Sequence, residues 1–229
     1  MLSVERDGFA IVPDVIPVAT ISQLTESLAD SSARRTRAGM RNVLGIPKVH
    51  ELAMRQTLLD LAEEVLGQAA TPFRGTLFDK SVHSNWLVVW HQDTALPIRE
   101  KRDAPGWGPW SVKNGVTCAH APASALEKVL AIRVHLDESN ADNGPLRVLP
   151  ATHKFGVLSD DQIHDLANSR GFFESHVGMG GALLMRPLII HASSKARSNA
   201  PRRVLHIEYA TSLCLSDHLE LAVDNPVVA

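Results

Sequence analysis

Residues 188–210 read LIIHASSKARSNAPRRVLHIEYA, and this stretch decides the fold class. One short apolar run ends at His191, a second covers residues 203–210, and a polar loop separates them. Short apolar runs bounded by Pro, Asn and Ser are typical of buried strands. We therefore expect two neighbouring antiparallel strands. This pairing would bring an arginine from the end of the loop, Arg202 or Arg203, beside His191.

The rest of the chain repeats this pattern. Strands are expected over residues 9–12, 75–78, 86–91, 129–136, 146–149, 182–185, 188–191 and 203–210. Three helices are expected: one capped by Thr20 with Gln23, one over residues 57–66 ending at Gly67, and one capped by Ser159 with Gln162. Because the helices do not alternate regularly with the strands, a doubly wound sheet is disfavoured. The pattern favours a mainly β fold with flanking helices, a double-sheet jelly roll.

Two connections carry their own signals. Asn143 and Gly144 lie between two apolar runs and predict a hairpin, since both residue types tolerate positive φ. Residues 97–120 are rich in Gly, Pro, Lys and Trp and lack periodicity, which predicts a long loop. Trp107 and Trp110 in that loop either close over a substrate as a lid or pack on the barrel.

Composition limits the function classes. The 229 residues carry 23 basic and 25 acidic side chains, a net charge of −2, which argues against a nucleic-acid or polybasic membrane partner. No apolar run approaches the roughly 18–20 residues of a membrane span, and the start shows no secretion signal. The two cysteines, Cys118 and Cys214, form no CxxC pair, so a cytoplasmic location is expected. Without repeats or linkers, residues 1–229 are expected to form one domain.

His91-Gln92-Asp93 is the sharpest local motif. On an extended backbone, residues two apart point to the same side, so His91 and Asp93 can offer an imidazole and a carboxylate to one point. His191 would complete two histidines and a carboxylate with open positions, the arrangement suited to non-haem Fe(II) and oxygen. The tripeptide by itself is weak, because most HxD sequences bind no metal.

A second HxD sequence competes for this role. His135-Leu136-Asp137 also follows an apolar run, and spacing does not exclude it. However, Asp137 opens a polar segment in which an aspartate normally serves as a turn or capping residue.

The arginines strengthen the assignment of His191. Arg202 shares a strand face with Val204, His206 and Glu208, while Arg203 shares the opposite face with Leu205, Ile207 and Tyr209. The face with the polar residues is the better candidate for a pocket wall. A buried arginine there needs an anionic partner, and a guanidinium binds a carboxylate through two parallel hydrogen bonds. Ser193 shares the face of His191 and offers a further hydrogen bond.

Several motifs together resemble the phytanoyl-CoA dioxygenase family of Fe(II)/2-oxoglutarate oxygenases. They are Leu77-Phe78-Asp79-Lys80, Trp90-His91-Gln92-Asp93, Asn143-Gly144-Pro145-Leu146-Arg147-Val148-Leu149-Pro150-Ala151-Thr152-His153, His191-Ala192-Ser193 and Pro201-Arg202-Arg203. Ala151 and Ala192 stand where the family usually has glycine. The likeness runs from about Asp7 to Tyr209.

The resemblance implies a double-stranded β-helix of cupin-like form, with Fe(II) on His91, Asp93 and His191. It implies that Arg202 and Ser193 hold the distal carboxylate of 2-oxoglutarate. Matching positions in relatives line the cosubstrate pocket, and here they are Thr76, Lys80 and Arg133. It also demotes His135 and Asp137 to a strand and turn.

The activity implied is a dioxygenase that uses Fe(II), 2-oxoglutarate and O2 to hydroxylate an aliphatic carbon of a small molecule, releasing succinate and CO2. The carboxylate of Asp93 favours hydroxylation or desaturation over halogenation. The alternatives are a non-catalytic jelly-roll binding protein and a cupin-type metal-dependent hydrolase or isomerase. The sequence names neither the substrate nor the oligomeric state.

Overall fold

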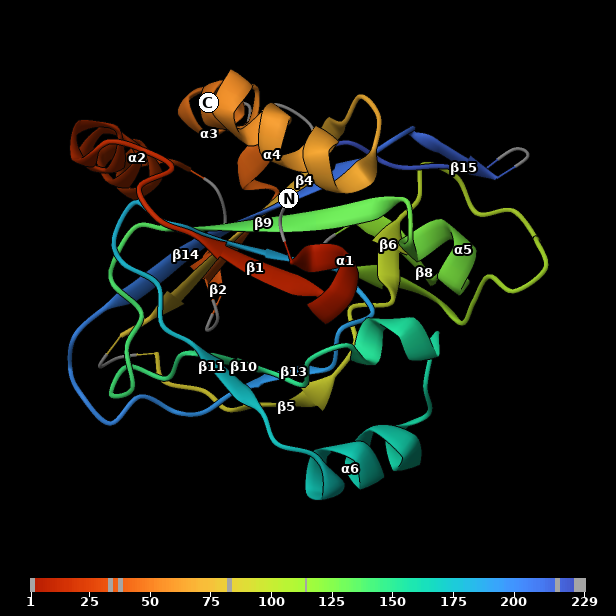
Figure 1. The fold of residues 1–229 in the computed structure, drawn as a ribbon. Helices are drawn as coiled ribbons and strands as arrows, with labels where there is room; N and C mark the ends of the chain where they lie inside the picture. Colours follow the sequence, from red (N-terminus) through yellow and green to blue (C-terminus); the bar gives the residue numbers. More distant parts are fainter. Residues whose placement is uncertain are drawn as a thin grey trace.

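Two antiparallel β-sheets face each other in the computed structural model, which describes residues 3–32, 35–36, 39–81, 84–113, 115–216 and 219–224 (Figure 1). The large sheet has the order β1 (Phe9–Val12), β12 (Ala182–Met185), β9 (Val129–His135), β14 (Arg202–Ala210), β4 (Thr71–Lys80), β3 (Gly39–Arg41) and β2 (Arg35–Thr36). The small sheet has the order β11 (Phe173–Ser175), β10 (Leu146–Val148), β13 (His191–Ser193) and β5 (Val88–His91).

Helices cover the outer faces of both sheets. The helices are α1 (Val4–Asp7), α2 (Val18–Asp30), α3 (Pro47–Ala53), α4 (Gln56–Leu66), α5 (Ala123–Leu126) and α6 (Asp160–Ser169), with 3-10 turns η1 (Val43–Gly45) and η2 (Thr152–Phe155). In Figure 1, α2, α3 and α4 lie above the large sheet and α6 lies below the small one. Within the described ranges, no helix combines the length and apolar character needed to cross a membrane.

Strand β9 shows why the sheets stack in this way, because all seven of its residues are buried. Leu130, Ile132 and Val134 pack in one hydrophobic cluster with residues of α2, α3 and α4. Ala131, between them in sequence, packs instead with Leu146 of the small sheet. Successive side chains of a strand point to opposite faces, so β9 contributes to both the helix layer and the barrel interior. The predicted jelly-roll fold with flanking helices is confirmed.

Two of the three predicted helix signals are confirmed, and one is wrong in detail. Gly67 ends α4 in the left-handed conformation, with φ of 74° and its N–H on the Glu63 carbonyl. Ser159 and Gln162 form the expected capping box of α6. Helix α2, however, begins at Val18 after Pro17, and Thr20 lies within its first turn without capping it.

The apolar run at residues 188–190 is a turn rather than the predicted strand. Leu188, Ile189 and Ile190 are all buried, yet each belongs to a different hydrophobic cluster. The N–H of Ile189 donates to the carbonyl of Arg186, which closes the turn. Strand β13 therefore starts at His191 instead of ending there. The prediction that it pairs with the strand over residues 203–210 is also wrong, because β13 lies in the small sheet and β14 in the large one.

The predicted hairpin at Asn143–Gly144 is also wrong, because β9 and β10 belong to different sheets. Gly144 does adopt a positive φ of 70°, but the turn carries the chain from the large sheet to the small one. The Asn143 side chain donates to the Glu138 carbonyl and accepts from the N–H of Asn140, which holds this crossing.

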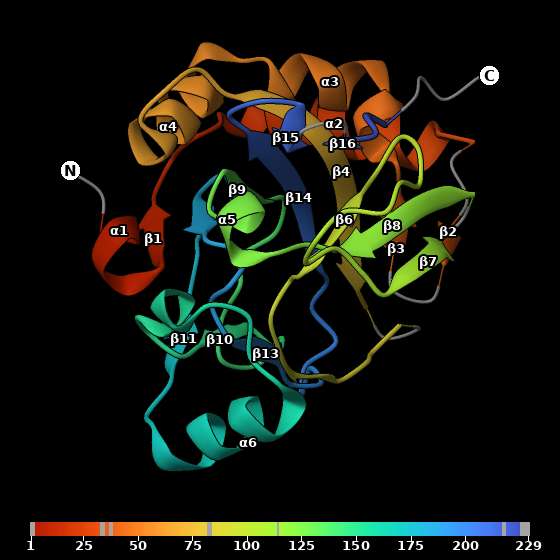
Figure 2. The same ribbon diagram turned by 90° about the vertical axis from the view of Figure 1, so that its right-hand side faces the viewer.

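The segment 97–120, predicted as an irregular loop, contains a hairpin. Strands β7 (Trp110–Lys113) and β8 (Val116–His120) pair with each other, and β8 also pairs with β6 (Ala95–Pro97). Together with α5, and with β15 (Cys214–Ser216) paired to β16 (Leu219–Glu220), they close one end of the barrel (Figure 2). Hairpin strands this short carry little hydrophobic periodicity, so the pattern did not predict them.

Candidate metal centre and anion pocket

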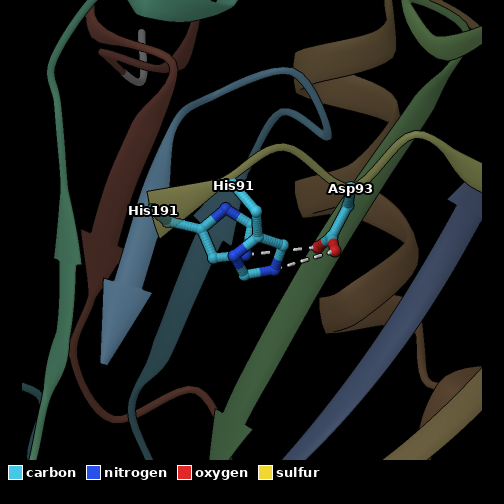
Figure 3. A group of neighbouring side chains, drawn as sticks. All are labelled: His91, Asp93 and His191. Atoms are coloured by element: carbon cyan, nitrogen blue, oxygen red, sulfur yellow. Dashed lines mark ion pairs between the residues drawn. The ribbon is translucent and has the colours of Figure 1, made fainter. Parts of the chain in front are cut away.

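His91 and His191 lie opposite each other in the small sheet, where β5 and β13 pair at this position. Asp93 follows β5, and its backbone N–H donates to the carbonyl of Pro187 at 2.9 Å. Figure 3 shows the two imidazole rings side by side with the carboxylate turned toward them. Strand pairing therefore brings together side chains that are 100 residues apart in the chain.

The three side chains converge on one point. The Nε2 atoms of His91 and His191 lie 3.6 and 3.5 Å from the two oxygens of Asp93, and the ring centroids are 4.2 Å apart. Each Nδ1 faces a backbone carbonyl instead, that of Val89 at 2.8 Å and that of Ile189 at 3.0 Å. An Nδ1–H held by a carbonyl leaves the Nε2 lone pair free to bind a metal.

Electrostatics favour an anionic carboxylate beside a neutral imidazole. Burial opposes the charge of Asp93, but His191 and His91 outweigh it and hold the pKa of this carboxyl well below its usual range. Burial lowers the pKa of His191 to about 4, although Asp93 acts in the opposite direction. Near neutral pH both groups are therefore in the protonation state that a metal ligand requires.

Gln92, between the two ligands of the HxD motif, was not singled out from the sequence. Its side chain points the other way and is buried. The amide donates to the carbonyls of Gly156 and Leu188 at 2.9 and 2.7 Å, and it accepts from the N–H of Leu158. Gln92 therefore ties the motif to two neighbouring chain segments and limits its movement.

A cluster of buried cations adjoins this centre through Ser193, two residues after His191. Lys80 and Arg202 are directly opposite each other on β4 and β14, and are 1% and 3% exposed. Lys80 donates to the Ser193 hydroxyl at 2.7 Å and to the Ser194 carbonyl. Arg202 donates to the Asn143 carbonyl at 3.2 Å and to the Ser193 hydroxyl at 3.4 Å.

Neither cation has a carboxylate partner among the described residues. Burial, followed by the charge of Arg202, lowers the pKa of Lys80 to about 7. Burial, followed by the charge of Arg133, lowers the pKa of Arg202 to about 9. Buried charges are strongly destabilising unless they are paired, so this pocket suits an anionic ligand.

Arg133 and Thr76 lie on either side of His206, opposite it on β9 and β4. The guanidinium of Arg133 donates to Nδ1 of His206 at 3.0 Å and lies 5.0 Å from the ring of Phe78. Its Nε has no partner among the described atoms. Arg133 thus adds a third buried cation on this face of the sheet. Thr76 lies on the same face, and its side chain makes no hydrogen bond to the residues that the structure describes.

A buried ion pair lies further along this wall. Arg74, which the sequence did not mark, donates to both carboxylate oxygens of Glu208, one of them at 2.6 Å. His206 Nε2 lies 3.7 Å from the same carboxylate. The polar face predicted for β14 therefore does line the interior, and Arg74 neutralises its acidic member.

The competing HxD sequence is used differently. Asp137 accepts hydrogen bonds from two guanidinium nitrogens of Arg203 at 2.8 and 2.7 Å. Among the described residues, His135 and Asp137 form no group of three candidate metal ligands, whereas His91, Asp93 and His191 do. Of the two adjacent arginines, Arg203 is therefore bound by Asp137 away from the interior, whereas Arg202 is buried beside Lys80.

Trp107 and Trp110, the two tryptophans of the segment 97–120, lie at the end of the barrel. Trp107 is 9% exposed and packs in a cluster with Leu126 and Leu215. Trp110 is partly buried against the same cluster, and the ammonium of Lys101 lies 5.9 Å from its ring. In this structure both rings pack on the barrel.

The donor set fits a first-row divalent metal. Such ions lie about 2.1 Å from nitrogen and oxygen ligands, so adjacent donors stand about 3 Å apart. The separations of 3.5 and 3.6 Å require only a small closure. Two histidines and one carboxylate with open positions are the ligands of non-haem Fe(II) oxygenases. The cations beside them suit a dicarboxylate that also reaches the metal.

Known proteins resemble this chain over most of its length. The family described as phytanoyl-CoA dioxygenase (PhyH) matches residues 4–204. L-Proline trans-4-hydroxylase from Streptomyces griseoviridis is 23% identical over 242 residues, covering 89% of this chain and 82% of that protein.

Solved structures show the same fold. EctD from S. alaskensis, with 2-oxoglutarate and 5-hydroxyectoine, has a TM-score of 0.71 and 19% identity, covering 98% of this chain and 79% of that chain. HygX from Streptomyces hygroscopicus, with nickel and 2-oxoglutarate, has a TM-score of 0.65 and 15% identity, covering 90% and 84%. With the family match over residues 4–204, this chain belongs to the phytanoyl-CoA dioxygenase family.

Proposed function

We propose that the chain, as a single domain over residues 1–229, is an Fe(II)- and 2-oxoglutarate-dependent dioxygenase. It hydroxylates an aliphatic carbon of a small molecule and releases succinate and CO2. The observation that carries the proposal is the pairing of a His91, Asp93 and His191 donor set with a neighbouring pocket of unpaired buried cations. A metal-only hydrolase needs the first feature but not the second.

The residues have separate tasks in this proposal. His91, Asp93 and His191 hold Fe(II), and Gln92 keeps the first two in place. Arg202, Ser193 and Lys80 bind the distal carboxylate of 2-oxoglutarate. Bound Fe(II) and 2-oxoglutarate supply the oxidising chemistry that activates O2, while the protein sets position and excludes water.

Charge balance explains the division of tasks. Arg202 and Lys80 repel each other when the pocket holds no anion, because burial weakens solvent screening between them. A carboxylate between them removes that repulsion. Arg133 and Thr76 lie on the same wall and would contact the body of the cosubstrate. These cations would therefore hold one carboxylate of 2-oxoglutarate, and the other end would be left for the metal held by His91, Asp93 and His191.

A small-molecule substrate is supported by the relatives. One relative is named for proline hydroxylation, and one solved structure contains 5-hydroxyectoine. The net charge of −2 shows no overall basic excess of the kind typical of nucleic-acid-binding proteins. We therefore propose a small organic substrate, and the hydroxylated carbon is to be found by screening.

The test is 2-oxoglutarate turnover. Purified protein with Fe(II), ascorbate and O2 is expected to convert 2-oxoglutarate to succinate, and a substrate pool should raise the rate. Asp93→Ala should abolish this conversion, while Arg203→Met outside the pocket should preserve it. Absence of succinate from wild-type protein under every substrate pool would favour a binding protein or a cupin-type hydrolase.

A further inference from the structure

Strand register defines the interior wall on which His135 lies. His135 is opposite Val204, and Arg133 is opposite His206, where β9 pairs with β14. On the far side of β14, Lys80 is opposite Arg202 and Phe78 is opposite Val204. Residues two apart on a strand share a face, so His135 lies on the same face of the sheet as Arg133. Val204, opposite His135, is two residues from Arg202, so His135 and Arg202 are diagonal neighbours on that face.

The side chain of His135 is deeply buried, and its imidazole makes no hydrogen bond to the described residues. It is 2% exposed, and neither Nδ1 nor Nε2 has a partner among the described residues. A buried polar group without a partner is destabilising by about 1–3 kcal/mol, so native proteins seldom keep one. The side chain therefore needs a partner that enters the interior.

The surroundings of His135 indicate the charge of that partner. Burial, followed by the charges of Arg133 and Arg202, lowers the pKa of His135 to about 3. The imidazole is therefore neutral and carries one N–H donor. Because Arg133 and Arg202 surround it with positive charge, an anion is the acceptor that this environment favours.

Three other histidines of the interior each have one ring nitrogen in a hydrogen bond. His91 and His191 direct Nδ1 to backbone carbonyls, and His206 receives a hydrogen bond from Arg133. Asp137, the acidic residue next to His135, is bound by Arg203. His135 thus differs from each of them, because neither of its ring nitrogens has a partner among the described residues.

We propose that His135 is a further cosubstrate-binding residue, whose ring N–H donates to the distal carboxylate of 2-oxoglutarate beside Arg202. This inference rests on the proposed function, because it assigns a residue to the same cosubstrate. It gives the carboxylate a neutral donor in addition to its cationic ones. A neutral donor adds affinity without adding to the repulsion between Lys80, Arg133 and Arg202.

Two substitutions separate hydrogen bonding from packing. His135→Phe keeps a ring of similar size and removes the N–H, whereas His135→Gln keeps an N–H donor. Binding of 2-oxoglutarate is measured without oxygen by titrating Fe(II)-loaded protein and following the visible charge-transfer band. Loss of one hydrogen bond to a charged group predicts binding about tenfold or more weaker in His135→Phe, and affinity closer to wild type in His135→Gln.

Controls and a second measurement keep the test decisive. Ser139→Ala is the matched control, because it removes a buried hydroxyl that also has no partner among the described residues; Ser139 pairs with Val177 beyond the end of β9, and this variant should leave 2-oxoglutarate affinity unchanged. Fe(II) affinity should be the same in all variants. In wild-type protein with 15N-labelled histidine and Zn(II) in place of Fe(II), 2-oxoglutarate should shift the His135 N–H resonance and slow its exchange.

The outcomes distinguish the two proposals. If wild-type protein does not bind 2-oxoglutarate in the presence of Fe(II), the proposed function fails. If it does, and His135→Phe binds equally tightly, only the assignment of His135 fails. Should His135→Phe not fold, the resonance decides: an unchanged His135 signal on addition of 2-oxoglutarate overturns the assignment.

Discussion

Replacing Arg202 with methionine should stabilise the protein in the absence of 2-oxoglutarate and abolish its response to that ligand. The pKa of Arg202 falls from 12.5 to about 9, which corresponds to roughly 5 kcal/mol of destabilisation at pH 7. Arginine is charged in both the folded and unfolded states at pH 7. The full penalty is therefore present below pH 9 and diminishes as the pH rises through the folded-state value.

Two losses oppose the stability that is gained by removing the buried charge of Arg202. The hydrogen bonds to Asn143 and Ser193 contribute about 1 kcal/mol each, and imperfect packing of methionine costs about 1 kcal/mol more. The free energy of unfolding should therefore rise by about 2 kcal/mol in Arg202→Met. With 2-oxoglutarate at about 100 times its dissociation constant, the free energy of unfolding should rise by about 2.7 kcal/mol in wild-type protein and little in the variant.

The assay is urea unfolding at pH 7, first on metal-free protein and then with Fe(II) and 2-oxoglutarate under anaerobic conditions. Arg203→Met is the matched control, since Arg203 is ion-paired with Asp137 and its side chain is 30% exposed. It should lose about 1 kcal/mol or less and keep the full ligand response. The reasoning is refuted if Arg202→Met is clearly less stable than wild type without ligand, or if 2-oxoglutarate stabilises both equally.

Three further predictions follow from the same geometry. The pKa of Lys80 is lowered to about 7, so 2-oxoglutarate binding should weaken as the pH rises above 7 and Lys80 loses its charge. Lys80→Met should make the affinity less dependent on pH. Calorimetry from pH 6 to 9 tests this, and the same pH dependence in both proteins would contradict it. Gln92→Leu removes the hydrogen bonds that hold the HxD segment in place, so Fe(II) binding should weaken about tenfold. Unchanged Fe(II) affinity in a metal competition assay would show that Gln92 does not position the ligands. Trp107→Ala should lower the free energy of unfolding by about 3 kcal/mol and leave Fe(II) affinity unaltered. If urea unfolding gives a decrease below about 1 kcal/mol, Trp107 does not act as a core residue.

Local patterns were sufficient to predict much of the fold and the convergence of the candidate ligands. The alternation in β14 separated Arg202 from Arg203, and the structure places these side chains in different environments. Two-residue spacing on an extended chain predicted that His91 and Asp93 would face one point, and they do. Each of these two inferences depends only on the local geometry of a single extended segment.

Features that depend on tertiary structure were beyond the sequence. Leu188 and its two neighbours resemble a strand because all three are buried, but each enters a different cluster. The pairing of Arg74 with Glu208 and the clamp made by Gln92 join segments more than 60 residues apart. The turn at Gly144 has hairpin residues, yet the sheet assignment of the flanking strands decides its role.

The central claim is that His91, Asp93 and His191 bind Fe(II) next to a pocket that binds 2-oxoglutarate. The most direct measurement is the visible spectrum of metal-free protein without oxygen, recorded after Fe(II) and again after 2-oxoglutarate. A charge-transfer band is predicted for wild type only after both additions, absent in Asp93→Ala and weakened in Arg202→Ala. A folded wild-type protein that binds Fe(II) but shows no band with 2-oxoglutarate would contradict the claim.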